Sequence, residues 1–366
     1  MRMKPLQTHK WMLWWAVPAL LLFVGCTSDA QKAKNSDTVE KELPWKGVSL
    51  RLVVAGDTPL AEAIDRLRGE WRASTGADLE VAEVNEEELL GEEPPQADAV
   101  IYPAYDLGVL AERKWLRPLP GKVLSSEELA WAEILEADKT FDANWGSVTY
   151  GFPFGSPTLV CFYRKDLLDK LNREPPATWS EYQQLAALLA NREHLGDAAP
   201  GADTAWSGTM EPLAEGWAGL TLLARAAAYA KHRNHFSTLF DMESMDPLIA
   251  GAPFARALEE LVAAKPHISE TALDASPQQV HEALLSGRCG MALTWSSAAF
   301  AGDDNASHTS PSGDELDLGC VELPGSPQAF NPKAEQWDAR REGESPRVPL
   351  VGIAGRLGSV TTRSEH

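Results

Sequence analysis

The chain has 366 residues, of which 44% are hydrophobic, and this is enough for two domains of ordinary size with buried cores. Its 33 basic and 53 acidic residues give a formal net charge of −20 at pH 7. Such a charge argues against nucleic acid or anionic lipid as partners, because both are themselves negatively charged.

Residues 1–25 predict a lipoprotein signal peptide. Three basic residues precede an apolar run at 11–24, which is shorter than the roughly 20 residues of a membrane-spanning helix. The run ends at Phe23-Val24-Gly25-Cys26, which resembles the lipobox of bacterial lipoproteins except that phenylalanine replaces the usual leucine. The resemblance implies that Cys26 is diacylated and anchors the mature chain to a membrane, with 26–45 as a polar tether. A signal anchor or a short buried helix is the alternative.

Three further cysteines, Cys161, Cys289 and Cys320, allow at most one intramolecular disulfide and leave one thiol over. The sequence does not indicate which pair would close. None of them has C-x-x-C spacing, so neither a thiol redox motif nor a zinc knuckle is predicted.

The first part of the fold has the pattern of a β-α-β unit. Alternating apolar residues indicate the opening strand, and a helix is expected to begin where Thr58 caps and Pro59 takes the first helical position. Gly76 ends that helix, and the next strand would be parallel to the first with a right-handed crossover. The expected elements are strands at 48–54, 79–84 and 97–102 and helices at 58–76 and 105–113.

The rest of the chain alternates strands with long helices rich in alanine and leucine, which makes the class α/β. Thr178 and Glu181 have the spacing of a capping box, and Ser276-Pro277 begins another helix that Gly287 ends. The expected elements are strands at 158–163 and 289–295 and helices from 178, at 213–231, at 254–264 and at 277–286, while 121–150 should hold a helix and connections.

The chemical motifs give no positive evidence for an enzyme, a metal or a cofactor. The three glycines at 352–358 do not match a dinucleotide-binding fingerprint, and no nucleophile elbow is present. His232 and His235 lie three residues apart on an expected helix, but no third ligand is near, so a solvated helix end explains them better than a metal site does. We therefore predict no catalytic residue, no metal site and no cofactor.

Taken together, the segments resemble the extracellular solute-binding proteins of ABC transporters, family 1, which includes maltose-binding and other sugar-binding proteins. The matching segments are 50–81, 98–119, 150–170, 175–182, 284–295, 318–325 and 347–366. The resemblance implies a two-lobed α/β fold with a ligand cleft between the lobes. Lobe I would span 46–155 with 346–366 returning to it, and lobe II would span 156–345.

The resemblance also implies a set of solute contacts, with aromatic rings stacking on sugar faces and carboxylates pairing with hydroxyl groups. The residues at matching positions are Asp57, Tyr102, Tyr105, Ser156, Trp217 and Trp295, with Trp206 and Glu211 as weaker candidates. Asp57, Tyr102 and Tyr105 follow expected strands, where open α/β sheets place their ligands. The alternative for Tyr102 and Trp295 is an ordinary core position, and Trp217 is open to the same explanation on its helix.

The sequence differs from the family pattern at the end of the chain. Family members continue with a helix, a return crossing and further helices after the strand that matches 349–355, whereas this sequence stops at 366. We therefore expect the closing helices to be missing, either because the chain is a fragment or because it is a reduced relative. An apolar face of lobe I, with Val351 and Ile353, should then lack its cover.

The function implied is capture of a small solute, with a carbohydrate favoured, outside the cytoplasm and its delivery to the permease subunits of an ABC transporter. A surface-anchored enzyme or a sensory lipoprotein built on the same lobes is the alternative. The identity of the solute and the membrane that carries the anchor are not readable from the residues.

Overall fold

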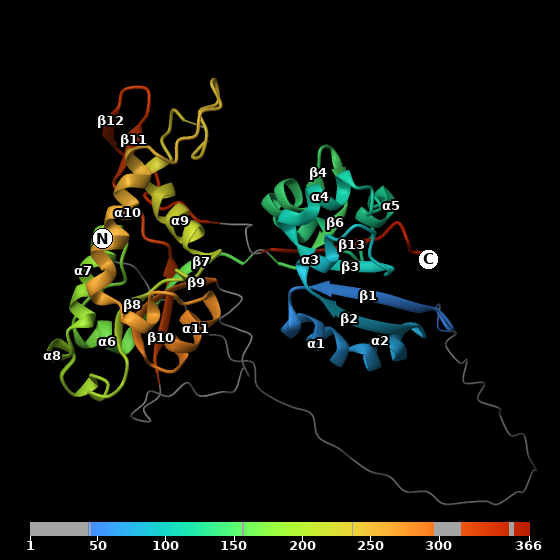
Figure 1. Cartoon of the computed structure of the whole chain (residues 1–366), viewed down its shortest axis with the longest axis horizontal. Helices are drawn as coiled ribbons and strands as arrows, with labels where there is room; N and C mark the ends of the chain where they lie inside the picture. The colour runs from blue at the N-terminus through green and yellow to red at the C-terminus, as the bar shows by residue number, and fades with distance from the viewer. Residues whose placement is uncertain (1–42, 44, 156, 236, 296–315, 351–354) are drawn as a thin grey trace, which may run out of the picture. The chain divides into compact units, whose positions relative to one another are not determined.

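The computed structural model describes residues 43, 45–155, 157–235, 237–295, 316–350 and 355–366. Its two larger β-sheets belong to two lobes, each with its own hydrophobic core (Figure 1). Lobe I is built on a five-stranded sheet and lobe II on a four-stranded sheet. The chain passes from lobe I to lobe II after β6 (Gly151–Pro153), and it returns before β13 (Arg356–Val360). The expected α/β class is confirmed.

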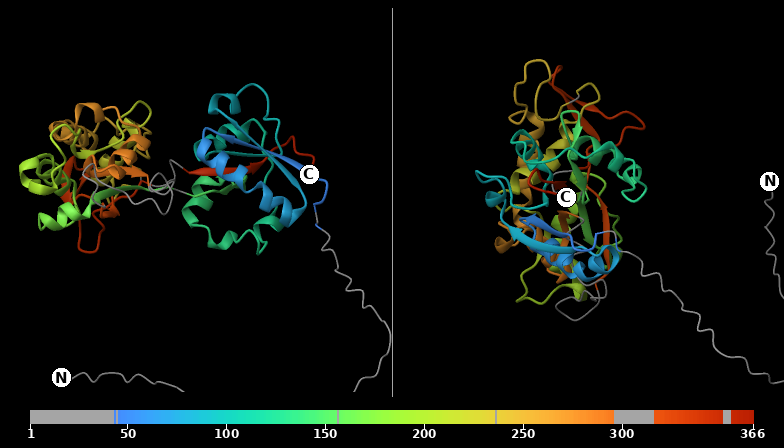
Figure 2. Two further views of the ribbon diagram at one scale, coloured as in Figure 1. Left: turned by 90° about the horizontal axis from the view of Figure 1, so that it is seen from below. Right: turned by 90° about the vertical axis from the view of Figure 1, so that its right-hand side faces the viewer.

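The sheet of lobe I has the order β2-β1-β3-β13-β6. Its first three strands are parallel, whereas β13 runs antiparallel to both β3 and β6. The first three strands are β1 (Ser49–Ala55), β2 (Asp78–Val84) and β3 (Ala99–Pro103). The carboxyl ends of these strands and the beginning of β13 therefore lie at the same edge of the sheet. The residues after β13 stay on lobe I (Figure 2). The backbone N–H groups of Thr361 and Thr362 donate there to the carbonyl oxygens of Asp98 and Trp115.

The expected β-α-β unit is present, with two corrections. The helix is divided at Leu67 into α1 (Thr58–Arg66) and α2 (Arg68–Thr75). Its N-cap is Asp57 rather than Thr58, because the Asp57 carboxylate accepts the Leu60 N–H at 3.1 Å. Gly76 ends α2 with a φ of 82°, as expected from the sequence.

The two faces of the lobe I sheet are covered unequally. One face packs Val53, Val100 and Leu357 against Leu107 and Leu110. Its covering segments include α3 (Glu86–Leu89), η1 (Ala104–Asp106) and α4 (Leu107–Glu112) (Figure 1). The segment expected to hold a helix and connections forms α5 (Gly121–Leu124), the short turns η2 (Trp131–Glu133) and η3 (Asp138–Asp142), and the hairpin of β4 (Asn144–Trp145) and β5 (Val148–Thr149).

On the other face, α1 and α2 leave an open groove of about 510 Å³. Its walls include Ile64 and Trp71 on the helix side and Phe152, Phe154 and Val360 on the sheet side. An apolar face without a cover was also expected on lobe I. The residues named for it, Val351 and Ile353, lie outside the described residues.

The sheet of lobe II has the order β10-β7-β9-β8. Its strands are β7 (Leu159–Arg164), β8 (Ser207–Met210), β9 (Cys289–Trp295) and β10 (Leu318–Glu322). The helices are α6 (Lys165–Lys170), α7 (Trp179–Ala190), α8 (Arg192–Leu195), α9 (Ala218–Ala230), α10 (Ala252–Ala264) and α11 (Pro277–Leu285). Three short turns join them, η4 (Gly196–Ala198), η5 (Lys265–His267) and η6 (Glu270–Ala272). Two further strands, β11 (Gln328–Asn331) and β12 (Gln336–Ala339), form a hairpin. Both expected caps are confirmed, since Thr178 with Glu181 and Ser276 with Gln279 form capping boxes.

The core of lobe II encloses a fully buried ion pair between Arg225 and Glu211. Arg225 has no solvent-accessible surface, donates to Glu211 Oε1 at 2.7 Å and lies 4.1 Å from the centre of the Trp179 ring. The pair explains how a charge can be buried there, because each ion neutralises the other. Cys161, Cys289 and Cys320 are free thiols. Within the described residues, no helix is long and apolar enough to cross a membrane.

Candidate functional site

Five polar residues gather at the edge of the lobe I sheet where its parallel strands end. Asp57 follows β1, Glu86 follows β2, Tyr105 and Asp106 follow β3, and Arg356 opens the antiparallel β13. We call this group the strand-end cluster. Ligands of open α/β sheets lie beyond the carboxyl ends of the strands, so the cluster occupies the edge that the topology favours for a site.

Arg356 ties two chain segments together. Its Nε lies 3.2 Å from Asp57 Oδ2, and its Nη1 and Nη2 donate to the carbonyl oxygens of Ala55 and Gly56 at 2.7 and 2.9 Å. All three guanidinium nitrogens therefore have protein partners, and the side chain holds the end of β1 rather than pointing free into solvent. Asp57 serves two purposes here, since its other oxygen caps α1.

Tyr105 connects the end of β3 to the start of α3. Its hydroxyl donates to Glu86 Oε2 at 2.8 Å, while 62% of the residue is exposed. Burial of the hydroxyl and the neighbouring Glu86 carboxylate raise the pKa of the Tyr105 phenol well above its ordinary value. The phenol therefore stays protonated and remains a donor, and its exposed ring offers a flat apolar face.

Asp106 is the buried member of the strand-end cluster. It is 5% exposed, and its Oδ2 has no hydrogen-bond partner. Burial raises the pKa of the Asp106 carboxyl to about 6, and the Glu86 carboxylate adds to the rise while the Arg356 guanidinium opposes it. An unpaired buried carboxylate oxygen is costly, so the site holds an unused acceptor.

The strand-end cluster thus combines three carboxyl groups, one guanidinium and one exposed phenol. Carboxylate oxygens accept hydrogen bonds from hydroxyl or amine groups, and an exposed aromatic ring can cover the apolar face of a small molecule. The arrangement can hold a polar solute. No nucleophile with an adjacent base lies in it.

The structure brings together two of the six residues nominated from the sequence, Asp57 and Tyr105. Tyr102 is a correction, because it has no exposed surface and its hydroxyl lies 2.8 Å from Ser359 Oγ in the core of lobe I. Successive side chains of a strand point to opposite faces, and that of Tyr102 lies in the core of lobe I, so a place near the strand end did not make it accessible. Ser156 lies outside the described residues.

The lobe II aromatics pack on one another. Trp295 is 3% exposed, and its ring centre lies 4.9 Å from that of Trp217, which is the N-cap residue of α9 and is only partly buried. Trp206 is buried with its indole N–H bonded to the Leu189 carbonyl at 2.8 Å, and Glu211 is the buried partner of Arg225. In this structure Trp295, Trp206 and Glu211 are core residues, as the alternative for Trp295 had allowed, and Trp217 retains some exposure.

Sequence reasoning missed Glu86, Asp106 and Arg356. Glu86 could have been found by the rule that selected Asp57, since both directly follow a parallel strand. Asp106 is next to Tyr105 and carried no further signal. Arg356 lies within the glycine-rich segment 352–358, where its pairing with Asp57 across 299 residues of sequence depends on the strand order.

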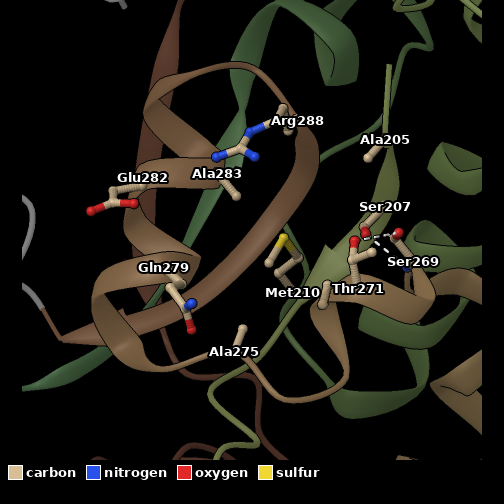
Figure 3. Close-up of a pocket in the computed structure, with 11 residues that line it drawn as sticks. Ala205, Ser207, Met210, Ser269, Thr271, Ala275, Gln279, Glu282, Ala283 and Arg288 are labelled. Atoms are coloured by element: carbon tan, nitrogen blue, oxygen red, sulfur yellow. Dashed lines mark hydrogen bonds between the residues drawn. The ribbon is translucent and has the colours of Figure 1, made fainter. Parts of the chain in front are cut away.

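A second hollow lies in lobe II, between α11 and β8, with a volume of about 240 Å³ (Figure 3). Ser207 Oγ accepts the Ser269 N–H at 2.8 Å on one wall, and Arg288 Nε donates to Ser286 Oγ at 2.7 Å near the other. Met210 and Ala275 form apolar parts of its lining.

In the described part of the chain no group of histidine, cysteine and acidic side chains is arranged to hold a metal ion. The side chain of His232 lies at hydrogen-bonding distance from Asp338.

The comparisons with known proteins agree with this fold. Solved structures of similar fold include an ABC-transporter solute-binding protein from Agrobacterium radiobacter K84 in complex with ribitol, with a TM-score of 0.65, 18% identity and coverage of 88% of this chain and 73% of that one. A second is the ABC-transporter solute-binding protein from Agrobacterium vitis S4 with bound D-mannitol. Its TM-score is 0.61 at 16% identity, and the match covers 87% of this chain and 69% of that one. A third is maltose-bound T. maritima MalE3. Its TM-score is 0.62 at 16% identity, and the match covers 87% of this chain and 73% of that one.

At these identities the likeness concerns the fold. No curated protein matches the chain. The family model described as "bacterial extracellular solute-binding protein" matches residues 86–334, which is more than half of the sequence. The chain therefore belongs to the family of bacterial extracellular solute-binding proteins.

Proposed function

We propose that this protein is a lipid-anchored, extracytoplasmic solute-binding protein that captures a small solute, with a carbohydrate favoured, and delivers it to an ABC permease. The observation that carries the proposal is the strand-end cluster, where an exposed aromatic ring and three carboxyl groups lie at the ligand-binding edge of the lobe I sheet. The solved structures of similar fold that contain ribitol, D-mannitol or maltose support a polyhydroxylated solute.

Each member of the cluster has a role in this proposal. The Tyr105 ring covers one face of the solute, and the carboxylates of Asp57 and Glu86 accept hydrogen bonds from its hydroxyl groups. Arg356 is a positioning residue, because its donors are already engaged with Asp57 and two carbonyl oxygens. Trp217 and Ser156 remain proposed contacts from lobe II. Solute binding would favour a closed arrangement of the lobes because the closed state makes contacts that the open state lacks.

A binding assay tests solute capture. The purified chain is titrated with ribitol, mannitol, maltose and their relatives, and unfolding is followed with and without each compound. A binding protein shows a rise in Tm that grows with ligand concentration, together with full recovery of the unchanged ligand. Consumption of the ligand would instead identify an enzyme and contradict the proposal.

Fractionation tests the anchor, which rests on Cys26 at the end of the apolar run. The wild type should label with a radioactive fatty acid and sediment with membranes, because two or more acyl chains hold a protein firmly to a bilayer. Cys26→Ser should lose the label and either leave the membrane fraction or accumulate unprocessed. The conservative change Cys320→Ser, at an exposed thiol, is the matched control and should alter neither property. Normal processing and labelling of Cys26→Ser would disprove the anchor.

A further inference from the structure

We propose that the solute held by the strand-end cluster carries a protonated amine, as amino sugars and polyamines do. The inference rests on the proposed function and narrows its solute class. It is motivated by the charge of the cluster, which contains three carboxyl groups, on Asp57, Glu86 and Asp106, and a single guanidinium.

The one cation in the cluster is already committed. Arg356 pairs with Asp57 at 3.2 Å, and its other two nitrogens bond backbone carbonyl oxygens. Within the described residues, neither Glu86 nor Asp106 forms an ion pair, and Glu86 receives only the neutral Tyr105 hydroxyl. Two negative charges therefore remain without a cation in the free protein.

The buried Asp106 carboxyl makes this more than a patch of acidic residues. Its Oδ2 is enclosed by protein and has no hydrogen-bond donor, although buried polar atoms are almost always paired. The groups that interact electrostatically with Asp106 are Glu86 from α3, Arg356 from β13, and the neighbouring phenols of Tyr102 and Tyr105. None of them supplies the missing donor. An ammonium group bound at the neighbouring Glu86 carboxylate would bring the opposite charge close to this carboxyl without having to reach its enclosed oxygen.

The exposed face of Tyr105 favours the same ligand. The ring lies beside Glu86, to which its hydroxyl is bonded, so a group that approaches Glu86 passes close to the ring. A cation is attracted to the face of an aromatic ring, whereas a neutral hydroxyl group gains much less from it. An amine would thus contact the ring and the Glu86 carboxylate, and its charge would relieve the repulsion between Glu86 and Asp106.

Matched pairs of sugars provide the test. Glucosamine and its β-1,4-linked dimer and trimer differ from glucose, cellobiose and cellotriose only by an amine in place of one hydroxyl group on each ring. Calorimetric titration of the full chain at low salt should show affinity for the amines that is about tenfold or more above that of their neutral partners. A separate titration with spermidine distinguishes an amino sugar from a linear polyamine as the preferred source of the amine.

A neutral sugar that binds as tightly as its amine partner would overturn this inference and leave the proposed function standing. If the neutral sugars and polyols, the amino sugars and spermidine all fail to bind, the proposed function itself is contradicted, and the inference falls with it. The two failures are therefore distinguishable in one set of titrations.

Charge-neutral variants locate the preference. Glu86→Gln keeps the shape of the side chain and should lower the affinity for the amines by about tenfold while changing the affinity for the neutral partners much less. Glu87→Gln, at the exposed neighbour on the same helix, is the matched control and should leave both affinities unchanged. Equal losses for amines and neutral sugars in Glu86→Gln would contradict a role for its charge.

Discussion

The Tyr105 hydroxyl donates a hydrogen bond to Glu86 Oε2 at 2.8 Å, which joins the end of β3 to the segment that follows β2. The other oxygen of the same carboxylate lies next to Gly56, the residue that follows β1, since a Cβ added there would come within 3.0 Å of Glu86 Oε1. Glu86 therefore bonds the residue after the end of β3 and lies close to the residue after the end of β1. A residue that sequence reasoning missed is at the centre of the candidate site.

Tyr105→Ala should separate binding from stability. Most of the Tyr105 ring is exposed, so its loss should change the free energy of unfolding little, because little buried area is removed. If the ring covers the solute, affinity should fall by about tenfold or more. Titration and thermal unfolding of the same variant measure the two effects. Tyr105→Phe, which keeps the ring, should retain most of the affinity, and an affinity unchanged by Tyr105→Ala would remove the ring from the site.

Gly56→Ala should destabilise lobe I. Gly56 has a φ of +62°, which costs a residue with a Cβ roughly 1–3 kcal/mol, and the new Cβ would also press on Glu86. Gly216→Ala is a control that isolates the first effect, since Gly216 has a φ of +83° and no atom within 4 Å of the added Cβ. Denaturant unfolding should show the larger loss for Gly56→Ala. Equal losses would mean that Glu86 moves away without cost.

Asp106→Asn should stabilise the free protein above about pH 6. Burial raises the pKa of Asp106 to about 6 in the folded state, whereas in the unfolded state it is about 4. Between these values the folded state binds more protons, so this group lowers stability as the pH rises from about 4 to 6. At neutral pH the Tm of the variant should be a few degrees higher than that of the wild type. Towards about pH 4 the two Tm values should become equal.

A difference in Tm between Asp106→Asn and the wild type that is the same at every pH would show that Asp106 does not titrate in this window. The same titration predicts how binding depends on pH. Affinity for an amine should rise as the pH increases through about 6, because Asp106 becomes negative. Affinity for a neutral sugar should change less over that range.

Trp295→Ala should destabilise the free protein by about 3–5 kcal/mol, because the ring is 3% exposed and packs against Trp217 at 4.9 Å. Removal of a buried indole leaves a cavity in the core of lobe II. Trp217→Ala should cost less, since Trp217 is only partly buried. Chemical unfolding of both variants provides the comparison. A loss of affinity without a loss of stability in Trp295→Ala would return this residue to the site.

Local patterns in the sequence predicted the elements of the fold well. The caps at Thr178 and Ser276 and the left-handed glycine at Gly76 depend on interactions within a few residues, and all three are present. The N-cap at Asp57 was placed one residue too late, because aspartate and threonine are both good caps. Interactions between residues close in sequence therefore predict the type of an element better than they predict the residue at which it begins.

The site was predictable only where one rule of topology applied. Asp57 and Tyr105 were nominated with the help of the rule that ligands lie beyond strand ends, and Glu86 also follows a parallel strand. Tyr102 and Trp295 satisfied the same rule but face the cores of their lobes, and burial is decided by packing across distant segments. Arg356 required knowledge that β13 lies beside β3, which no local pattern in the sequence contains.

Hydrogen–deuterium exchange of the purified chain, with and without a sugar, polyol or amine that stabilises it, tests the central claim most directly. Backbone amides slow their exchange where a ligand stabilises the local structure. The account predicts protection of the peptides that contain Asp57, Glu86, Tyr105 and Arg356 at the carboxyl edge of the lobe I sheet. Protection confined to other segments, such as those around Ser207 and Arg288, with no change at this edge, would contradict it.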